Sequence, residues 1–392
     1  MSAPPKIHIW IPDYDSSMGG IQVFSRFLIR ALRDCLPDAA ISVLSKNDYS
    51  SPAMHLGPHS DFCCAGWWPP QMRTPAFACQ LLAHTLRHRP DLVLSTHVNF
   101  SPAASWAKRL IRFSYAAVAH GVDVWSVPRR WLKPALRRAD RVLAVSRFTR
   151  DRMVEEMQLQ PAQVGVLPNT VDAEQFFPAP KPRYLLKRFG LKPDQPVILT
   201  VARLASEERY KGYDQVMRAL PAIKCALPNV RYILGGRGRD RPRVEEMVRQ
   251  LKLDGSVTLA GYIPDHELRD FYNLSDVFAM PSKREGFGIV FLEALACGKP
   301  VLAGNKDGSV DALLDGELGV LVDPDNVSEI GQALSAVLQQ QHPLAILRQP
   351  EQLRTRVVEA FGYPRFVTYV AEHLAALGFP PDGSKSPCET NQ

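Results

Sequence analysis

The sequence of 392 residues predicts an α/β protein built from two doubly wound, Rossmann-like domains. Three observations predict this fold class. The chain is too long for one compact core and long enough for two α/β domains of about 150–200 residues each. Short runs of apolar and β-branched residues alternate with longer runs of helical periodicity, a pattern typical of a parallel sheet covered on both faces. The alternation stops once, at a proline-rich segment, and then resumes.

The first domain is expected over residues 1–175. Helices of the expected type include residues 21–33, where the apolar side chains share one face. Buried strands are predicted between the helices, at residues 7–12, 40–45, 91–96, 115–119, 141–146 and 164–167.

The linker is predicted at residues 176–183, because Pro178, Pro180 and Pro182 cannot lie inside a helix or a central strand. The second domain is expected over residues 184–361, with strands at 196–202, 230–235, 256–260, 277–281 and 300–303 and later helices at 327–340 and 352–361. A C-terminal helix within residues 362–378 is expected to return to the first domain. The polar tail, residues 379–392, is expected to be disordered.

The composition is that of an ordinary soluble globular protein. Hydrophobic residues make up 46% and charged residues 22% of the chain, and no apolar run reaches the roughly 18–20 residues that span a bilayer. The first residues lack the features of a signal peptide, so we expect a cytoplasmic protein. Seven cysteines occur without Cys-x-x-Cys spacing, which indicates neither a disulfide framework nor a zinc site.

The net charge of +7 is concentrated in the first half of the chain. Residues 106–152 contain twelve Lys or Arg and three Asp, interspersed with tryptophans. Such a stretch fits a solvated helix face, and it equally fits peripheral contact with an anionic membrane surface, here the inner face of the cytoplasmic membrane. No nucleic-acid-binding motif accompanies the charge, so nucleic acid is not expected as a partner.

The most informative motif is E-G-F-G-I-V-F-L-E, residues 285–293, after the predicted strand 277–281. Two glycines before a helix allow a ligand close to the backbone, and the first helical amides bind phosphate well. Carboxylates repel phosphate, so Glu285 and Glu293 are expected to accept hydrogen bonds from the hydroxyls of a sugar and a ribose. The simpler interpretation is that Glu285 complements the helix dipole and Glu293 is an ordinary helical residue.

Cations and glycines follow two other predicted strands of the second domain. Arg203 and Lys211 follow strand 196–202 and are expected to converge on a diphosphate, whose charge on leaving must be neutralised. Arg209 is a third candidate, although an exposed surface position is its better interpretation. Gly236 belongs to a glycine cluster that allows the backbone to pass a nucleotide, a weak motif by itself.

The first half adds three features at predicted strand ends. Gly19 and Gly20 open a helix suited to contact with a phosphate. His120 ends a strand at the expected ligand edge of the sheet, although a lone histidine is more often structural. The segment 168–172, P-N-T-V-D, turns toward the linker and has a structural role as its simplest interpretation.

Taken in order, these motifs resemble the GT-B retaining glycosyltransferases of family 4, the glycosyl transferases group 1, over about residues 6–375. The resemblance implies two Rossmann-like domains facing across a cleft, a donor held mainly by the second, and retention at the anomeric carbon by a front-face reaction. It implies no metal and no other cofactor.

The resemblance also implies roles for individual residues. It assigns catalytic contacts to His120, Arg203, Lys211 and Glu285. It assigns donor-binding contacts to Gly19, Gly20, Arg203, Lys211, Gly236, Tyr262, Glu285, Gly288, Ile289, Val290 and Glu293. Arg203 and Lys211 bind the diphosphate, Glu285 contacts the transferred sugar, and Glu293 holds the ribose.

The remaining assignments concern the sugar ring, the phosphate and the base. His120 lies against the sugar ring, Gly20 encloses the phosphate, and the backbone around Tyr262 faces the base. Two departures from the family pattern stand out. Seven residues separate Arg203 and Lys211, where five are commoner, and D-G-S-V-D at 307–311 replaces a Gly-Gly segment with a later glutamate.

The expected function is therefore transfer of a hexose from GDP-mannose, UDP-glucose or UDP-GlcNAc to a saccharide or lipid-linked acceptor, in bacterial polysaccharide, lipopolysaccharide or glycolipid synthesis. Three alternatives remain. Asp13 and Asp15 suggest a metal-dependent transferase of the other common architecture. A nucleotide-sugar epimerase would use the same phosphate contacts without an acceptor, and an inactive nucleotide-sugar-binding partner protein would bind the donor without turnover.

Overall fold

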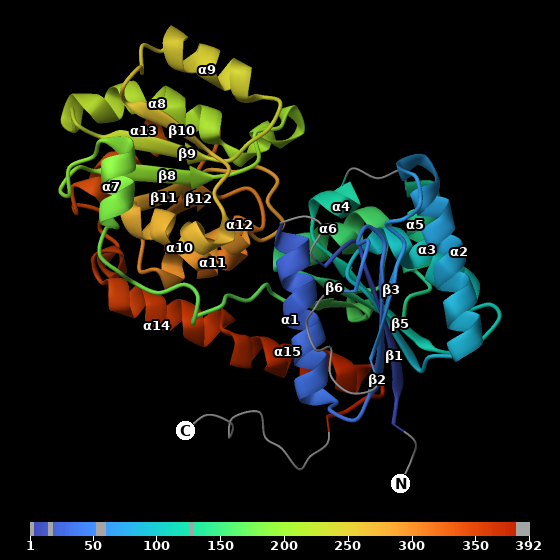
Figure 1. The fold of residues 1–392 in the computed structure, drawn as a ribbon. Coiled ribbons are helices and arrows are strands. Elements are labelled where there is room, and N and C mark those ends of the chain that lie inside the picture. The colour runs from blue at the N-terminus through green and yellow to red at the C-terminus, as the bar shows by residue number, and fades with distance from the viewer. Residues whose placement is uncertain (1–3, 15–18, 52–59, 126–128, 382–392) are drawn as a thin grey trace. The chain divides into compact units, whose positions relative to one another are not determined.

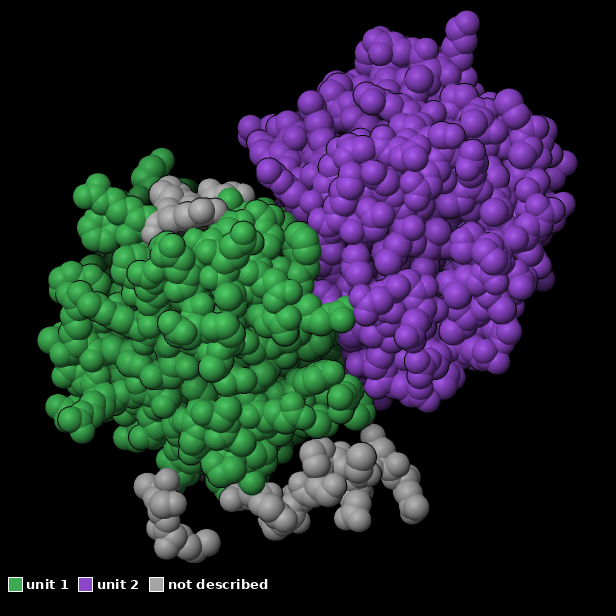
Figure 2. All heavy atoms as spheres, turned by 180° about the vertical axis from the view of Figure 1, so that it is seen from behind, with its two compact units in different colours: residues 1–170, 364–392 green, residues 171–363 purple. Residues whose placement is uncertain are grey.

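The computed structural model describes residues 4–14, 19–51, 60–125 and 129–381, and it divides the chain into two compact units. Unit 1 comprises residues 1–170 and 364–392, and unit 2 comprises residues 171–363 (Figure 2). The predicted linker, residues 176–183, belongs to unit 2, and the last long helix belongs to unit 1. Residues 382–392 of the predicted disordered tail lie outside the described residues.

Unit 1 is built on a sheet of seven parallel strands in the order β3-β2-β1-β4-β5-β6-β7. The strands are β1 (Lys6–Ile11), β2 (Ala40–Ser45), β3 (Asp61–Cys64), β4 (Leu92–Ser95), β5 (Ser114–Ala119), β6 (Arg141–Ala144) and β7 (Val164–Val166). Except in the edge strand β3, their apolar residues are mostly buried, which explains why they read as continuous hydrophobic runs. The six predicted strands are confirmed within a few residues, and β3 was not predicted.

Helices cover both faces of this sheet (Figure 1). α1 and α15 lie on one face, where the rings of Phe24 and Phe366 meet edge to face at 5.7 Å, and α2 and α3 lie on the other. The helices of unit 1 are α1 (Gly20–Cys35), α2 (Pro70–His88), α3 (Ser101–Ala107), α4 (Val122–Trp125), α5 (Arg129–Leu136), α6 (Arg147–Met157) and α15 (Tyr363–Ala376), with short 3₁₀ turns η1 (Val98–Phe100) and η2 (Pro161–Gln163).

Unit 2 contains a sheet of six parallel strands in the order β10-β9-β8-β11-β12-β13. The strands are β8 (Val197–Val201), β9 (Arg231–Gly235), β10 (Val257–Gly261), β11 (Val277–Met280), β12 (Val301–Gly304) and β13 (Val320–Val322). The first five match the predicted strands, and β13 was not predicted. Two complete parallel sheets confirm the expected fold class.

The helices of unit 2 also form two layers, with α8, α9 and α13 on one side of the sheet and α10, α11 and α12 on the other (Figure 1). They are α7 (Arg183–Phe189), α8 (Tyr213–Ala226), α9 (Arg241–Gln250), α10 (Asp265–Leu274), α11 (Ile289–Ala296), α12 (Ser309–Ala312), α13 (Val327–Leu338) and α14 (Pro350–Phe361), with 3₁₀ turns η3 (Ser206–Lys211), η4 (Leu314–Gly316) and η5 (Ala345–Arg348). Within the described residues, no helix is both long and apolar enough to cross a bilayer.

Candidate functional site

The strand order of unit 2 indicates where a ligand is expected to bind. β8 lies between β9 and β11, so the connections leave β8 in opposite directions along the sheet. Open α/β sheets bind ligands beyond the carboxyl ends of the strands at such a switch point. The predicted donor motif follows β11, and the predicted cations follow β8. Both are therefore at this position in the fold.

The loop after β8 packs against the loop after β11. Gly212 has φ +83°, and a Cβ there would lie 2.2 Å from the carbonyl oxygen of Pro281, so only glycine fits. The amide of Lys283 donates to the carbonyl of Tyr210 at 2.9 Å. These contacts fix the backbone on both sides of Lys211.

The cation and the acid of the predicted site form an ion pair. Lys211 Nζ lies 2.8 Å from Glu285 Oε2, and each side chain is 17% exposed. Burial alone would lower the pKa of Lys211, but attraction to Glu285 outweighs it and the pKa is raised. Lys211 is therefore a fixed positive charge at the switch point.

Arg203 stands at the start of the same loop and is much more exposed. Its side chain is 77% exposed and pairs with Glu208 of η3. Arg203, Lys211 and Glu285 all lie close enough to Tyr210 to affect its pKa, which burial raises. The structure thus brings both predicted cations to one loop, with Arg203 toward solvent.

The first turn of α11 presents backbone donors to the same region. Gly288 caps the helix with φ +91°, and a Cβ there would lie 2.4 Å from the ring of Phe291. The amides of Ile289 and Val290 fall in the first turn, where a helix offers no carbonyl partner. An anion would be stabilised there by these amides and by the helix dipole.

Asp307 fixes the loop that precedes α11, and its role was not predicted. The amide of Glu285 and the hydroxyl of Ser282 each donate to Asp307 Oδ2 at 2.7 Å. Gly308, next in the chain, donates its amide to the Glu285 carbonyl at 2.8 Å. Burial raises the pKa of Asp307 to about 6, against hydrogen bonds that lower it. The segment 307–311, noted as a departure, therefore holds Glu285 in place.

Glu293 is buried in the second turn of α11, at 6% exposure. The Tyr272 hydroxyl donates to its Oε2 at 2.7 Å. Burial raises the pKa of Glu293 to about 7, although the Tyr272 hydrogen bond lowers it. Among the described residues, no donor to Oε1 is found, so this oxygen remains able to accept from a ligand hydroxyl.

The loops after β9 and β10 complete the edge of the sheet. Gly236 has φ +138°, and a Cβ there would lie 1.8 Å from the Ala202 carbonyl oxygen. Its amide donates to the Gly261 carbonyl at 2.6 Å. Tyr262 is half exposed, with the Arg237 guanidinium 4.9 Å from its ring centroid. The glycine cluster thus allows close approach of two loop backbones, and Tyr262 presents an accessible ring beside them.

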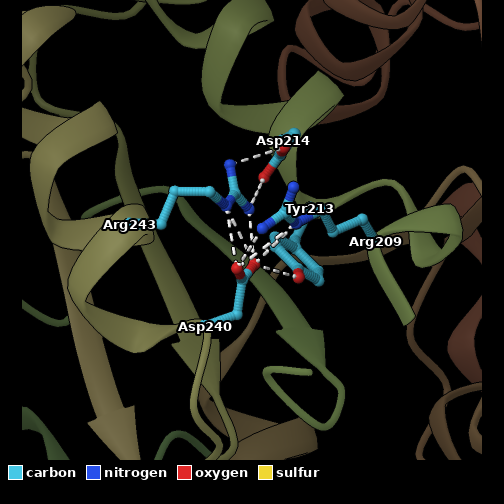
Figure 3. A network of polar contacts seen from close by, with 5 residues as sticks. All are labelled: Arg209, Tyr213, Asp214, Asp240 and Arg243. Atoms are coloured by element: carbon cyan, nitrogen blue, oxygen red, sulfur yellow. Dashed lines mark hydrogen bonds and ion pairs between the residues drawn. The ribbon is translucent and has the colours of Figure 1, made fainter. Parts of the chain in front are cut away.

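Arg209 is exposed, as expected, and it also belongs to a polar network beside this loop (Figure 3). Its Nη2 lies 2.6 Å from Asp240 Oδ1, and Arg243 donates to the same carboxylate at 2.6 Å. The Tyr213 hydroxyl adds a third donor at 3.0 Å, and Arg243 also pairs with Asp214 at 2.9 Å. The hydrogen bonds from Arg243 hold the pKa of Asp240 well below its usual range. Arg209 therefore joins η3 to the loop after β9.

In unit 1, His120 follows β5 at the equivalent edge. Its Nε2 lies 2.9 Å from the carbonyl oxygen of Thr96. A carbonyl can only accept, so Nε2 carries the proton and Nδ1 is the acceptor in the neutral ring. Burial, reinforced by His97, lowers the pKa of His120 to about 3, so the ring is neutral at physiological pH.

Gly19 and Gly20 are exposed at the start of α1, as predicted, with Gly19 in extended backbone at φ −175°. Of the remaining sequence candidates, Asp13 is buried and Asp15 lies outside the described residues. In the part of the chain that is described, no group of three or more His, Cys, Asp or Glu could hold a metal ion. The predicted residues thus fall into two sets, one at the carboxyl edge of each sheet.

Models of two glycosyltransferase families match consecutive parts of the chain. Residues 18–175 match the model described as "Glycosyltransferase Family 4", and residues 185–356 match "Glycosyl transferases group 1". The first match covers most of unit 1 and extends to residue 175 of unit 2, and the second lies within unit 2.

Several curated proteins are similar in sequence. A GDP-mannose-dependent alpha-(1-6)-phosphatidylinositol monomannoside mannosyltransferase of Mycolicibacterium smegmatis is 36% identical over 57% of this chain and 60% of its own length. This chain thus matches only about three-fifths of that relative. A monoacylated-acceptor counterpart of Corynebacterium glutamicum is 27% identical over 86% of this chain and 90% of that protein.

Solved structures show the same fold. Sucrose-phosphate synthase from Thermosynechococcus elongatus superposes with a TM-score of 0.79 at 22% identity, covering 95% of this chain and 99% of that one. Anabaena HepE in complex with UDP-glucose gives 0.75 at 19% identity, covering 95% and 100%. At these identities the likeness concerns the fold alone. It excludes the other common glycosyltransferase architecture suggested by Asp13 and Asp15.

Proposed function

Because the chain belongs to the group 1 glycosyltransferases of the GT-B fold, we propose that it transfers a hexose, with retention, from a nucleotide-diphosphate sugar to a saccharide or lipid-linked acceptor. The observation that carries this proposal is the Lys211–Glu285 pair beside the open first turn of α11. The cation suits the diphosphate of a donor, the helical amides suit its leaving oxygen, and the carboxylate suits the hydroxyls of its sugar.

Each residue then has a distinct task. Lys211 and Arg203 neutralise the charge that develops on the departing nucleotide diphosphate, as do the amides of Ile289 and Val290. Glu285 orients the hexose through its hydroxyls, and Glu293 accepts from the ribose through Oε1. Neutralisation by protein groups accounts for leaving-group stabilisation without a metal or other cofactor.

His120 supplies a neutral acceptor. With its proton on Nε2, held by the Thr96 carbonyl, its Nδ1 can accept from a sugar hydroxyl but cannot donate. In a front-face reaction the leaving phosphate oxygen accepts the proton of the acceptor hydroxyl, so no side chain has to act as nucleophile. His120 therefore contributes binding and orientation and not acid catalysis.

GDP-mannose is the first donor to test, because the relatives from Mycolicibacterium smegmatis and Corynebacterium glutamicum are both named as GDP-mannose-dependent enzymes. UDP-glucose and UDP-GlcNAc complete the panel. A bound donor raises stability by RT ln(1 + [L]/Kd), about 2.7 kcal/mol at one hundred times Kd, which a thermal-shift assay detects.

Transfer is then measured with the stabilising donor and a panel of saccharide and lipid acceptors, with excess chelator, and the anomeric configuration is read by NMR. We expect an α-linked product from an α-linked donor. Donor binding without hydrolysis or transfer would instead indicate an inactive binding protein, and isomerised sugar without acceptor would indicate an epimerase. Loss of activity with chelator would contradict metal independence.

A further inference from the structure

Besides His120, the carboxyl edge of the unit 1 sheet carries charged and aromatic residues that the donor chemistry does not use. Lys46 follows β2, Trp67 follows β3, His97 follows β4 and His120 follows β5. Because these strands are parallel, their following loops lie at one edge of the sheet. Ligands of such sheets bind at this edge.

Arg73, on α2, connects two of these loops. Its Nη2 donates to the Gly66 carbonyl at 2.9 Å and to the Tyr49 hydroxyl at 3.2 Å, and its Nε donates to the Trp68 carbonyl at 3.3 Å. Every one of these acceptors is neutral, as is the Asn47 side-chain oxygen that Nη1 approaches at 3.4 Å. Arg73 is thus held in place, and no carboxylate in the described parts of the chain pairs with it.

Lys46 is a second cation close by. It is half-buried, burial lowers its pKa, and the positive charge of Arg73 lowers that pKa further. The nearby Asp48 carboxylate instead accepts from the Tyr14 amide at 2.6 Å and the Ser45 hydroxyl at 2.5 Å. Across the described residues, neither Lys46 nor Arg73 forms an ion pair with a carboxylate. Two neighbouring cations of this kind disfavour each other unless an anion binds between them.

His97 extends this row of donors toward His120. Its Nδ1 accepts from the Asn99 amide at 3.2 Å, so the neutral ring carries its proton on Nε2 and can donate from there. Burial, followed by the charge of Lys46, lowers the pKa of His97 to about 4. The residue before it, Thr96, holds His120 through its carbonyl at 2.9 Å. Lys46 and His97 therefore lie at the same edge of the sheet as His120.

Exposed aromatic rings border the cations. Trp67 is 75% exposed and Tyr49 is 53% exposed, and their rings meet edge to face with centroids 6.1 Å apart. Trp68 is also accessible, at 46%. Ligand sites combine aromatic walls with a few polar groups that fix orientation, and these loops supply both.

We infer that Lys46, Arg73 and His97 form an anion site for the acceptor, which is a phosphate-bearing saccharide or polyol whose ring packs against Tyr49 and Trp67. This inference rests on the proposed glycosyl transfer and names the class of its acceptor. The phosphate can belong to a soluble sugar phosphate or to a phospholipid headgroup, because the shared chemistry is a phosphate ester beside a ring of hydroxyls.

The test measures binding to the full chain by calorimetry, with mannose 6-phosphate against mannose and myo-inositol 1-phosphate against myo-inositol. Phosphatidylcholine vesicles containing phosphatidylinositol or phosphatidylglycerol form the membrane arm. We expect a phosphate-bearing probe to bind at least tenfold more tightly than its neutral counterpart. Lys46→Ala should weaken that probe at least tenfold. The matched control is Lys6→Ala. Lys6 begins β1, at the opposite edge of the sheet from Lys46, so this variant should leave binding of the probe unchanged.

Comparing the soluble probes with the vesicles identifies the source of the phosphate. Tight binding of a soluble probe assigns a sugar phosphate, and preference for phosphatidylinositol over phosphatidylglycerol vesicles assigns a headgroup. Trp67→Ala should weaken the sugar phosphate but not inorganic phosphate, because only the former has a ring to pack.

Equal binding of phosphorylated and neutral probes, or unchanged binding in Lys46→Ala, would overturn the inference. So would equal binding to both anionic vesicles without any soluble probe bound, since that indicates general membrane contact. Donor affinity measured on the same preparations distinguishes failure of the anion-site inference from failure of the proposed function. Intact donor binding with no acceptor discrimination refutes the anion site alone, whereas absent donor binding refutes the proposed function.

Discussion

Lys211 Nζ lies 2.8 Å from Glu285 Oε2, although the two residues are separated by 74 positions in the chain. Each side chain is only 17% exposed, and the pair lies at the switch point of the unit 2 sheet. A donor that binds there must share Lys211 between its diphosphate and Glu285. We therefore propose that the pair couples recognition of the phosphate to recognition of the sugar.

The first prediction concerns this coupling. Lys211→Met should lower kcat/KM for the donor at least a hundredfold, about 2.7 kcal/mol, because it removes the phosphate cation and leaves Glu285 unpaired. Glu285→Gln should lower it at least tenfold, and the double variant should lose less than the product of the two effects. Steady-state kinetics on the four proteins measures this coupling. Lys283→Met, whose partner Asp325 is exposed, is the control and should change kcat/KM less than twofold. Fully multiplicative effects would contradict the coupling.

The second prediction separates Arg203 from Glu293. Arg203→Ala and Glu293→Ala should each weaken donor binding or slow turnover at least tenfold, about 1.4 kcal/mol. Arg203 is 77% exposed, so its loss should leave the unfolding free energy almost unchanged, whereas loss of the buried Glu293 removes the partner of Tyr272. Kinetics combined with denaturant unfolding distinguishes the cases. Activity like that of the wild type in both folded variants would refute the site assignment.

The third prediction concerns the first turn of α11. Gly288→Ala should weaken donor binding at least tenfold and lower the unfolding free energy by about 1–3 kcal/mol, since φ is +91° and the new Cβ meets the Phe291 ring at 2.4 Å. Gly190→Ala is a matched control, because φ is +61° and no atom lies within 4 Å of the added Cβ. It should cost stability without affecting the donor. Equal donor affinity in both variants would show that the α11 amides do not bind it.

The fold was largely predictable, and the two missed strands show where prediction stops. β3 has four residues and β13 has three, and both are at sheet edges. β3 begins with Asp61 and is only partly buried, so it has no continuous apolar run. Length does not explain why β13 was missed, because the equally short edge strand β7 was predicted. The central strands were found because burial on both faces requires a continuous apolar sequence.

The candidate site was predictable in its motifs and not in its contacts. The glycines and the two glutamates of residues 285–293 are visible in sequence because spacing along a helix start is local. Asp307 and Asp240 act through partners more than twenty positions away, so no local pattern shows that they hold Glu285 and Arg209. The exposed position of Arg209 was predicted, but its pairing with Asp240 was not.

The fourth prediction concerns the Asp240 network. Asp240→Asn should lower the unfolding free energy by at least about 2 kcal/mol, less than for a fully buried pair because both arginines keep solvent contact. Arg209→Ala should raise the donor KM several-fold with a smaller loss of stability, because it releases the turn that carries Lys211. Arg209→Lys should restore part of the lost donor affinity. Arg249→Ala, which breaks an exposed ion pair, is the control. A donor KM unaffected by Arg209→Ala would show that the network only stabilises the fold.

The fifth prediction concerns pH. Burial raises the pKa of Glu293 to about 7, and only the ionised carboxylate accepts from a ribose hydroxyl at both oxygens. Donor affinity should therefore rise roughly tenfold or more between pH 5.5 and 8, since the ionised fraction grows across the pKa. The stability of the unliganded protein should move in the opposite direction. A carboxyl with a raised folded pKa contributes stability that is present below its ordinary pKa and lost as pH rises through about 7.

Titration calorimetry and denaturant unfolding across this range measure both trends, and Glu293→Gln should flatten both, because the amide does not titrate. Tyr272→Phe removes the hydrogen bond that lowers the Glu293 pKa, so the midpoint of the affinity change should move to higher pH. Donor affinity that is constant with pH in the wild type, or that retains its slope in Glu293→Gln, would exclude Glu293 as the group that reads the ribose.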